Sequence, residues 1–458
     1  MSRLHHGSGS GPVAVAGLGL TGAASVRFLA ALGVRVLACD EHPHPAAAKG
    51  LGQLPGVTLN LGQLPAAAMA DCESVLLSPG IPRRHPALAE ALSRGVPVIN
   101  DIEWLYTWVN EQVGERPFIG ITGTNGKSTV TTLVGQMLNE AGKNFQVGGN
   151  LGEAALSLWD LKAKGYVLEL SSFQLESIDQ FRAQVGVLLN LTPDHMDRYD
   201  NLAAYLEAKK RIFENRQAGD WGVVSGDDPV LLGPLLRELE NGPGRLMPFS
   251  IQRPMPGGIS ALGEHLIDFR NGRPAPLMDL TRLRMVGRHN KANAAAATAV
   301  ALTQGVAPEV ISQVLETFPG LPHRMEWIRT LDGVPWYNDS KGTNAGAVAQ
   351  SLSSLTGRVI LIAGGRDKKG DFAMLAPLVR QHAEAVILMG EAAGAMEKAF
   401  AGLARIEKVG GMAEAVEMAR DLAEPGCAVL LSPACASFDQ FDSFEHRGDV
   451  FREAVHAL

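Results

Sequence analysis

The stretch at residues 120–129, GITGTNGKST, constrains this chain more than any other. Apolar residues precede it and helix-forming residues follow, so the pattern predicts a buried strand, a tight glycine turn and a helix. In that arrangement backbone N–H groups and a helix start converge and attract phosphate oxygens. Lys127 adds a positive charge, and Ser128 or Thr129 offers a hydroxyl to magnesium. Ile121 replaces the first glycine of the usual phosphate loop, so this is a variant loop. Few structural turns need Gly-Lys-Ser at the start of a helix, so the stretch favours ATP binding over a structural turn.

Length and composition set broad limits. With 458 residues the chain is too long for one core, and we expect three domains. A net charge of −7 argues against nucleic acid as a partner. The glycine-interrupted first apolar segment is neither a membrane span nor a signal peptide, so we expect a cytoplasmic protein with no membrane partner, preceded by a flexible tail at residues 1–11. Four widely spaced cysteines favour reduced, buried thiols: Cys39, Cys72, Cys427 and Cys435.

The first domain, placed at residues 1–107, begins as a dinucleotide-binding pattern. A strand runs into GLGLTG at residues 17–22, a helix follows, and a second strand ends at Asp40. This pattern indicates a Rossmann-like domain better than it indicates NAD. A further strand at residues 74–77 brings Ser78 to the carboxyl edge of the sheet, where ligands bind in open α/β sheets.

The second domain, placed at residues 108–320, contains the phosphate loop and one strand-end acid. Glu169 closes a short apolar strand downstream of the loop, which is a suitable position to hold magnesium directly or through water. His195 follows the next buried strand and lies among acidic residues, either as a ligand or orienting group or as an ordinary surface histidine. Lys209 belongs to a basic run that, by itself, predicts a solvated helix face.

The rest of the second domain is less specific. The Asn271-Gly272 pair in a region rich in Pro and Gly predicts a surface hairpin. Asn290 and Asn293 share a face at the start of an Ala-rich helix, where they face the nucleotide or, for Asn290, cap the helix.

The third domain, placed at residues 321–458, predicts a parallel sheet with polar loops at one edge. Strands at residues 334–337, 358–363 and 428–431 each end in such a loop, and this clustering is how an α/β domain builds a site. No G-x-S-x-G turn surrounds Ser437 or Cys435, which argues against covalent nucleophilic catalysis.

Together these motifs resemble the Mur ligases of bacterial cell-wall synthesis, nearly end to end. The phosphate loop is shared by the Mur ligases and the folylpolyglutamate synthases, and in this family it takes the form seen at Ile121. The stretches DSK at residues 339–341 and SPACAS at residues 432–437 are similar to those of the glutamate-adding members. Further similar stretches are residues 17–22, 78–80, 148–150, 169–176, 194–199, 289–290 and 321–324.

The resemblance implies an α/β fold of three domains, namely a Rossmann-like N-terminal domain, a central phosphate-loop ATP-binding domain and a C-terminal Rossmann-like domain. It also implies an ATP-dependent and Mg²⁺-dependent amide ligase of peptidoglycan precursor synthesis. Such an enzyme adds D-glutamate to UDP-N-acetylmuramoyl-L-alanine through an acyl phosphate. We expect it to be a cytoplasmic monomer.

Residue roles carry over from the resemblance position by position. Catalysis is assigned to Lys127, His195 and Lys209, and metal binding to Ser128, Glu169, His195 and, as a carbamate, Lys209. ATP binding is assigned to Gly123, Thr124, Asn125, Gly126, Lys127, Ser128, Thr129, Asn290, Arg324 and Asp339. The UDP-substrate is assigned to Leu18, Thr21, Asp40, Ser78 and Asn150, and glutamate to Lys368, Ser437 and Phe444. The chain departs from some relatives at Glu41-His42, where a Thr-Arg pair is expected beside the uracil.

Three alternatives remain open. An NAD-dependent dehydrogenase takes the first glycine motif literally but leaves the second phosphate loop and the third domain unexplained. A nucleotide-gated binding protein has no ligase chemistry, and a folylpolyglutamate synthase uses a different acceptor.

Overall fold

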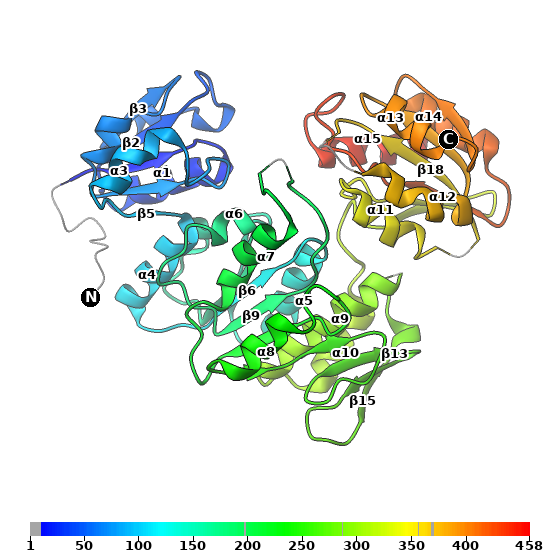
Figure 1. Ribbon diagram of the computed structural model, residues 1–458, viewed down its shortest axis with the longest axis horizontal. Helices are drawn as coiled ribbons and strands as arrows, with labels where there is room; N and C mark the ends of the chain where they lie inside the picture. Colours follow the sequence, from blue (N-terminus) through cyan, green and yellow to red (C-terminus); the bar gives the residue numbers. More distant parts are fainter. Residues whose placement is uncertain (1–10, 197, 286, 356, 368–370) are drawn as a thin grey trace.

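The computed structural model describes residues 11–196, 198–285, 287–355, 357–367 and 371–458. These residues form three α/β lobes, which follow one another along the chain from blue through green to red (Figure 1). Residues 1–10 of the tail expected at residues 1–11 lie outside the described residues, as does Lys368. The predicted three-domain α/β fold is confirmed.

The first lobe is a parallel sheet in the order β3-β2-β1-β4-β5. The predicted glycine turn connects β1 to α1, and Gly22 is required there because a Cβ would lie 1.8 Å from the carbonyl oxygen of Gly17. Its strands are β1 (Val13–Ala16), β2 (Val36–Asp40), β3 (Val57–Leu61), β4 (Ser74–Leu77) and β5 (Val98–Ile99), and its helices are α1 (Leu20–Ala31), α2 (Ala66–Ala70) and α3 (Ala89–Ser93).

The middle lobe contains a parallel sheet in the order β11-β10-β9-β6-β8-β7 and a smaller mixed sheet in the order β12-β13-β14-β15. The predicted hairpin is confirmed, because β14 and β15 are antiparallel on either side of Asn271-Gly272. The strands of the main sheet are β6 (Phe118–Thr122), β7 (Phe145–Gly149), β8 (Gly165–Glu169), β9 (Val185–Leu188), β10 (Trp221–Val224) and β11 (Arg245–Leu246). The smaller sheet has β12 (Phe249–Ser250), β13 (Ile259–Leu262), β14 (His265–Asp268) and β15 (Ala275–Asp279).

The helices of the middle lobe pack on these sheets (Figure 1). They are α5 (Lys127–Glu140), α6 (Ser172–Leu175), α7 (Leu202–Lys210), α8 (Pro234–Asn241), α9 (Arg288–Thr303) and α10 (Pro308–Thr317). Helix α9 is alanine-rich and almost wholly buried, because it packs against α5 on one side and the smaller sheet on another. Its start at Arg288, after Gly287, places Asn290 inside the first turn rather than at the cap.

The third lobe is a sheet in the order β16-β17-β21-β18-β19-β20, parallel except for the edge strand β16. Strands β17, β21 and β18 are neighbours, so their carboxyl ends form one edge, as predicted. The strands are β16 (Glu326–Leu331), β17 (Val334–Asn338), β18 (Arg358–Gly364), β19 (Ala383–Met389), β20 (Arg405–Lys408) and β21 (Cys427–Leu431). The helices are α11 (Ala345–Leu352), α12 (Ala376–His382), α13 (Ala393–Phe400), α14 (Met412–Leu422) and α15 (Phe444–Ala457).

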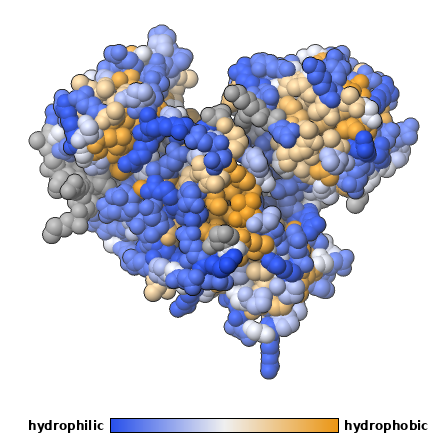
Figure 2. Space-filling view, in the orientation of Figure 1, coloured by the Kyte–Doolittle hydropathy of each residue, from blue (hydrophilic) through white to orange (hydrophobic). Residues whose placement is uncertain are grey.

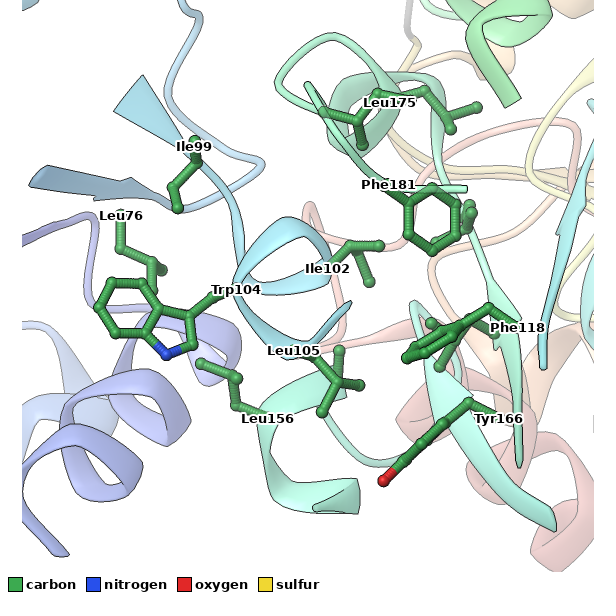
Figure 3. Close-up of a cluster of buried hydrophobic side chains, with 14 of the residues drawn as sticks. Leu76, Ile99, Ile102, Trp104, Leu105, Phe118, Leu156, Tyr166, Leu175 and Phe181 are labelled. Atoms are coloured by element: carbon green, nitrogen blue, oxygen red, sulfur yellow. The ribbon is translucent and has the colours of Figure 1, made fainter. Parts of the chain in front are cut away.

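Helix α4 (Asp101–Val113) joins the first lobe to the middle lobe and runs unbroken across residue 107, where we placed the first boundary. Trp104 points from α4 toward Leu76 of the first sheet, whereas Ile102 and Leu105 face the middle-lobe side (Figure 3). The Glu103 carboxylate accepts the backbone N–H groups of residues 179, 180 and 181 at 2.8–2.9 Å. One continuous apolar core therefore runs through both lobes.

Polar residues dominate the visible face, and apolar residues gather in a band near its centre and on the third lobe (Figure 2). None of the helices in the described part of the chain has the length and apolarity needed to cross a membrane. All four cysteines are free thiols, as predicted, but only Cys39, Cys72 and Cys435 are buried, because Cys427 lies at the partly exposed start of β21.

Candidate active site

The phosphate loop has the predicted strand–turn–helix form, with β6 ending at Thr122 and α5 beginning at Lys127. Gly126 has φ 86°, and a Cβ there would lie 2.4 Å from Asn293 Oδ1, so only glycine fits. The loop is fixed from outside as well. The Asn125 N–H donates to Asn190 Oδ1 at 2.8 Å, and the Thr124 hydroxyl donates to the carbonyl oxygen of Thr192 at 3.1 Å. The conformation of the loop is therefore fixed by its glycine and by hydrogen bonds to residues 190 and 192.

Lys127 and Lys209 meet at one oxygen atom of this loop. Their Nζ atoms donate to the carbonyl oxygen of Gly123 at 3.0 and 2.9 Å, respectively. Lys209 is 1% exposed, so the basic-face alternative is wrong for this residue. Burial lowers the pKa of Lys209 well below its ordinary value, and the adjacent Lys127 ammonium lowers it further. Burial also lowers the pKa of Lys127, against the opposing effect of Glu169.

The residues predicted to hold metal lie around this loop. Glu169 is buried at the end of β8. Its Oε1 accepts from Asn150 Nδ2 at 2.9 Å, and its Oε2 has no hydrogen-bond partner among the residues that the structure describes. His195 has φ 57°, and its Nε2 lies 3.7 Å from Asp194 Oδ2. No group of three or more His, Cys, Asp or Glu side chains with metal-site geometry occurs among the described residues. A buried carboxylate oxygen without a partner nevertheless fits a hard cation such as Mg²⁺.

A cavity of about 600 Å³ lies between the middle and third lobes. The loop residues Asn125, Gly126 and Thr129 form part of its lining, together with Asn290 and Asn293 of α9. Arg324 and Asp339 line it from the third lobe, so the structure brings together predicted ATP-binding residues that lie about 200 positions apart in the chain. Ser128 is buried in the first turn of α5 and accepts a hydrogen bond from Arg324 Nη2 at 3.0 Å.

Charges from the third lobe shape this cavity. Burial raises the pKa of Asp339 to about 6, although hydrogen bonds from the Ser351 and Ser432 hydroxyls, at 2.6 and 2.7 Å, oppose the rise. Burial and the nearby Arg324 lower the pKa of Lys341 to about 8. Burial and Arg324 likewise lower the pKa of His289 to about 4, which keeps this ring neutral at neutral pH. Sequence reasoning assigned no role to Lys341 or His289, although Lys341 stands two residues after Asp339.

The predicted UDP-binding residues of the first lobe gather at the carboxyl ends of β1, β2 and β4. Asp40 Oδ2 accepts the backbone N–H of Leu18 at 2.6 Å, and the N–H of Ser78 donates to the carbonyl oxygen of Ala16 at 2.9 Å. Thr21 lies in the first turn of α1 and is partly buried. Beside them Glu41 Oε1 lies 3.2 Å from His85 Nε2, so the residue that departs from the expected Thr-Arg pair is tied to the loop after β4.

The predicted glutamate-binding residues that the structure describes lie on the third lobe. Ser437 is buried after β21, and Phe444 begins α15. Lys341 Nζ lies 3.7 Å over the centre of the Phe444 ring. Arg447 is buried below them, and its Nη2 donates to the carbonyl oxygens of Ser340 and Cys435 at 2.8 and 3.2 Å. Arg447 therefore holds two of the strand-end loops together.

The fold and this site define a nucleotide-binding α/β protein whose phosphate loop faces a third domain. Three family descriptions match: the Mur ligase MurD-like N-terminal domain over residues 11–100, the Mur ligase middle domain over residues 121–301 and the Mur ligase glutamate ligase domain over residues 323–435. The chain belongs to the Mur ligase family.

Full-length relatives agree with this. The chain is 41% identical to the UDP-N-acetylmuramoylalanine--D-glutamate ligase of Syntrophotalea carbinolica, and the match covers 97% of each chain. It is also 41% identical to the UDP-N-acetylmuramoylalanine--D-glutamate ligase of Nitrosococcus oceani, with coverage of 97% of this chain and 96% of the relative. In fold it is similar to a pseudomurein peptide ligase of Methanothermus fervidus, with a TM-score of 0.63, 19% identity and coverage of 98% and 100% of the two chains. It is also similar to a Thermotoga maritima ligase solved with ADP, with a TM-score of 0.58, 18% identity and coverage of 81% and 92%.

Proposed function

We propose that this chain is an ATP-dependent amide ligase that joins D-glutamate to UDP-N-acetylmuramoyl-L-alanine in peptidoglycan precursor synthesis. The observation that carries the proposal is the cavity where the phosphate loop meets Arg324 and Asp339 of the third lobe. Family membership removes the dehydrogenase alternative. The names of the full-length relatives favour glutamate ligation over folylpolyglutamate synthesis.

The chemistry needs an activated carboxylate, because a carboxylate and an amine do not condense in water. An oxygen of the alanyl carboxylate attacks the γ-phosphorus of ATP, the bond from that phosphorus to the β–γ bridging oxygen breaks, and ADP leaves. The glutamate nitrogen then attacks the acyl carbon of the acyl phosphate. The bond from that carbon to the phosphate oxygen breaks, inorganic phosphate leaves, and the amine proton passes to water.

The residues of the chain supply charge and position for both steps. Negative charge accumulates when two anionic groups approach, and the Lys127 and Arg324 cations oppose that repulsion. Mg²⁺, when bound, would neutralise phosphate charge. Ser128, Glu169 and His195 would hold it, together with Lys209 as a carbamate. Carbamate formation needs a neutral amine, and the burial of Lys209 beside Lys127 favours that form.

The remaining assignments belong to the same proposal. Leu18, Thr21, Asp40, Ser78 and Asn150 hold the UDP-substrate, and Lys368, Ser437 and Phe444 position glutamate. We further propose domains at residues 1–107, 108–320 and 321–458, and a monomer that acts in the cytoplasm. Light scattering during size-exclusion chromatography tests the oligomeric state.

Mass spectrometry of the products tests the reaction. Incubation with ATP, Mg²⁺, UDP-N-acetylmuramoyl-L-alanine and D-glutamate should give a UDP-linked product that carries one added glutamate. Omission of ATP should abolish it. Binding of ATP without any such product would instead support the nucleotide-gated binding protein.

A further inference from the structure

Arg198 connects two loops that belong to different lobes. Its Nη1 donates to the carbonyl oxygen of Pro79 at 2.9 Å, across 119 positions of the chain. Arg84 makes the reverse contact, because its Nη2 donates to the carbonyl oxygen of Arg198 at 3.1 Å. Each loop therefore gives an arginine side chain to a backbone carbonyl of the other loop.

The Arg198 guanidinium is also fixed within the middle lobe. Its central carbon lies 3.9 Å over the centre of the Phe173 ring, and its Nη2 donates to Glu176 Oε2 at 3.2 Å. The Tyr199 hydroxyl donates to the other oxygen of Glu176 at 2.5 Å. The Arg198 side chain is only 13% exposed, so these polar contacts are less screened than those of a surface ion pair.

The two connected loops lie beside residues of the proposed UDP-substrate site and of the proposed metal site. Pro79 follows Ser78, which is assigned to the UDP-substrate. On the other side the Arg198 N–H donates to the carbonyl oxygen of His195 at 2.9 Å, and the Phe173 ring lies edge-on to the His195 ring at 4.9 Å. Arg198 therefore lies between the loop of Ser78, which is proposed to hold the UDP-substrate, and His195, which is proposed to bind the metal.

A second connection between these lobes already exists at α4, through the apolar core around Trp104 (Figure 3). The Glu103 carboxylate adds to it by accepting the backbone N–H groups of residues 179–181. Helix α1 also packs directly against residues 155–158 of the middle lobe, and the contacts of Arg198 and Arg84 add a further restraint on the angle between the two lobes. We propose that Arg198 is a positioning residue that sets the orientation of the first lobe, and with it the place where the UDP-linked carboxylate meets the phosphate loop. This inference rests on the proposed function.

Two variants of Arg198 test the inference. Arg198→Ala should lower kcat at least about tenfold, because a small misplacement of reacting groups is costly. The dissociation constants for ADP and for UDP alone should stay within about twofold of wild type, since neither ligand is proposed to bind across the contact between the first and middle lobes. Arg198→Lys keeps the charge but not the planar fork, so it should be intermediate. Arg282→Ala removes an arginine that is exposed and pairs with Glu316 in the same lobe, and it should match wild type.

Hydrogen exchange gives a readout that does not depend on turnover. Peptides covering residues 78–85 should exchange faster in Arg198→Ala than in wild type, whereas peptides from α4 should not change. A normal kcat in Arg198→Ala, or unchanged exchange at residues 78–85, would overturn the positioning role. Equal loss of ADP binding, UDP binding and thermal stability would overturn it too, in favour of a purely structural role. Wild-type protein that forms no glutamyl product would count against the proposed function, while the exchange data would still decide the connection between the lobes.

Discussion

Arg324 Nη2 donates to Ser128 Oγ at 3.0 Å, so a side chain at the start of the third lobe contacts the first turn of the helix that follows the phosphate loop. A second contact between the same lobes lies nearby, where Asn344 Nδ2 donates to Asp194 Oδ2 at 3.3 Å. The third lobe therefore brings a cation to the place where terminal phosphates of a bound nucleotide are expected.

Removal of that cation should weaken nucleotide binding. Glu169 and Asp339 both favour the charged form of Arg324, although burial lowers its pKa. We expect Arg324→Met to weaken ATP binding about tenfold, since hydrogen bonds to charged groups contribute about 1.5–3 kcal/mol. Calorimetric titration with a non-hydrolysable ATP analogue measures the effect. Arg358→Met, at an exposed arginine paired with Glu384, is the matched control, and equal affinities for both variants would contradict the assignment of Arg324.

Lys127→Ala should abolish turnover and leave binding of the UDP-substrate largely intact. Most residues proposed for the UDP-substrate lie in the first lobe, whereas the Lys127 ammonium donates to the loop carbonyls of Gly123 and Thr124 in the middle lobe. Product formation and titration with UDP-N-acetylmuramoyl-L-alanine measure the two effects separately. If both were lost to the same extent, Lys127 would have to support the fold rather than the phosphoryl transfer.

A carbamate on Lys209 is directly observable. Protein equilibrated with ¹³C-labelled bicarbonate should show a carbamate signal by NMR, because the buried Lys209 amine favours its neutral form. The signal should vanish in Lys209→Arg, whose side chain keeps the charge but cannot form a carbamate.

The neighbouring Lys210 gives the control. Burial lowers the pKa of Lys210, but hydrogen bonds to Glu238 and Glu207 outweigh that effect and raise it overall. Lys210→Arg should therefore retain the carbamate signal. Loss of the signal in Lys210→Arg rather than in Lys209→Arg would place the carbamate on Lys210 and contradict its assignment to Lys209.

Asp101 should make stability depend on pH. Burial raises its folded-state pKa from 3.8 to about 6, against the opposing effect of the nearby Gln174 side chain. The folded state therefore holds this proton more tightly than the unfolded chain, and the contribution of Asp101 to stability falls as pH rises from about 4 to about 6. Asp101→Asn removes the buried charge and should raise the free energy of unfolding at pH 7 by on the order of 2 kcal/mol.

Denaturant unfolding of both proteins at pH 7 and pH 4 measures that difference, which should disappear at the lower pH. Asp332→Asn is the control, because Asp332 is exposed and its φ of 51° suits asparagine equally. A gain that is the same at both pH values would mean that the charge of Asp101 is not its cause.

Local signals in the sequence predicted most of the fold. The phosphate loop and the glycine turn after β1 have fixed geometry, because Gly126 and Gly22 have no room for a side chain. Apolar runs predicted the buried strands with only small errors, such as the expected strand at residues 358–363, which the structure shows as β18 at Arg358–Gly364. These signals depend on neighbours in the chain, so one sequence is enough to find them.

The contacts between lobes could not be predicted from local sequence patterns. Arg198 and Pro79 are 119 positions apart, and Arg324 and Ser128 are 196 apart. The basic run around Lys209 predicts a solvated face by its composition, and only packing against Tyr205 and the phosphate loop shows that this lysine is buried. Roles that depend on such contacts need the arrangement of the lobes.

Phosphate release with different amino acids distinguishes D-glutamate ligation from the other reactions of an amide ligase. Wild-type protein is supplied with ATP, Mg²⁺ and UDP-N-acetylmuramoyl-L-alanine, and then with D-glutamate, L-glutamate or a diamino acid. We predict sustained release with D-glutamate only, and none without the UDP-substrate. Release that is independent of the amino acid, or greater with a diamino acid, would contradict the account.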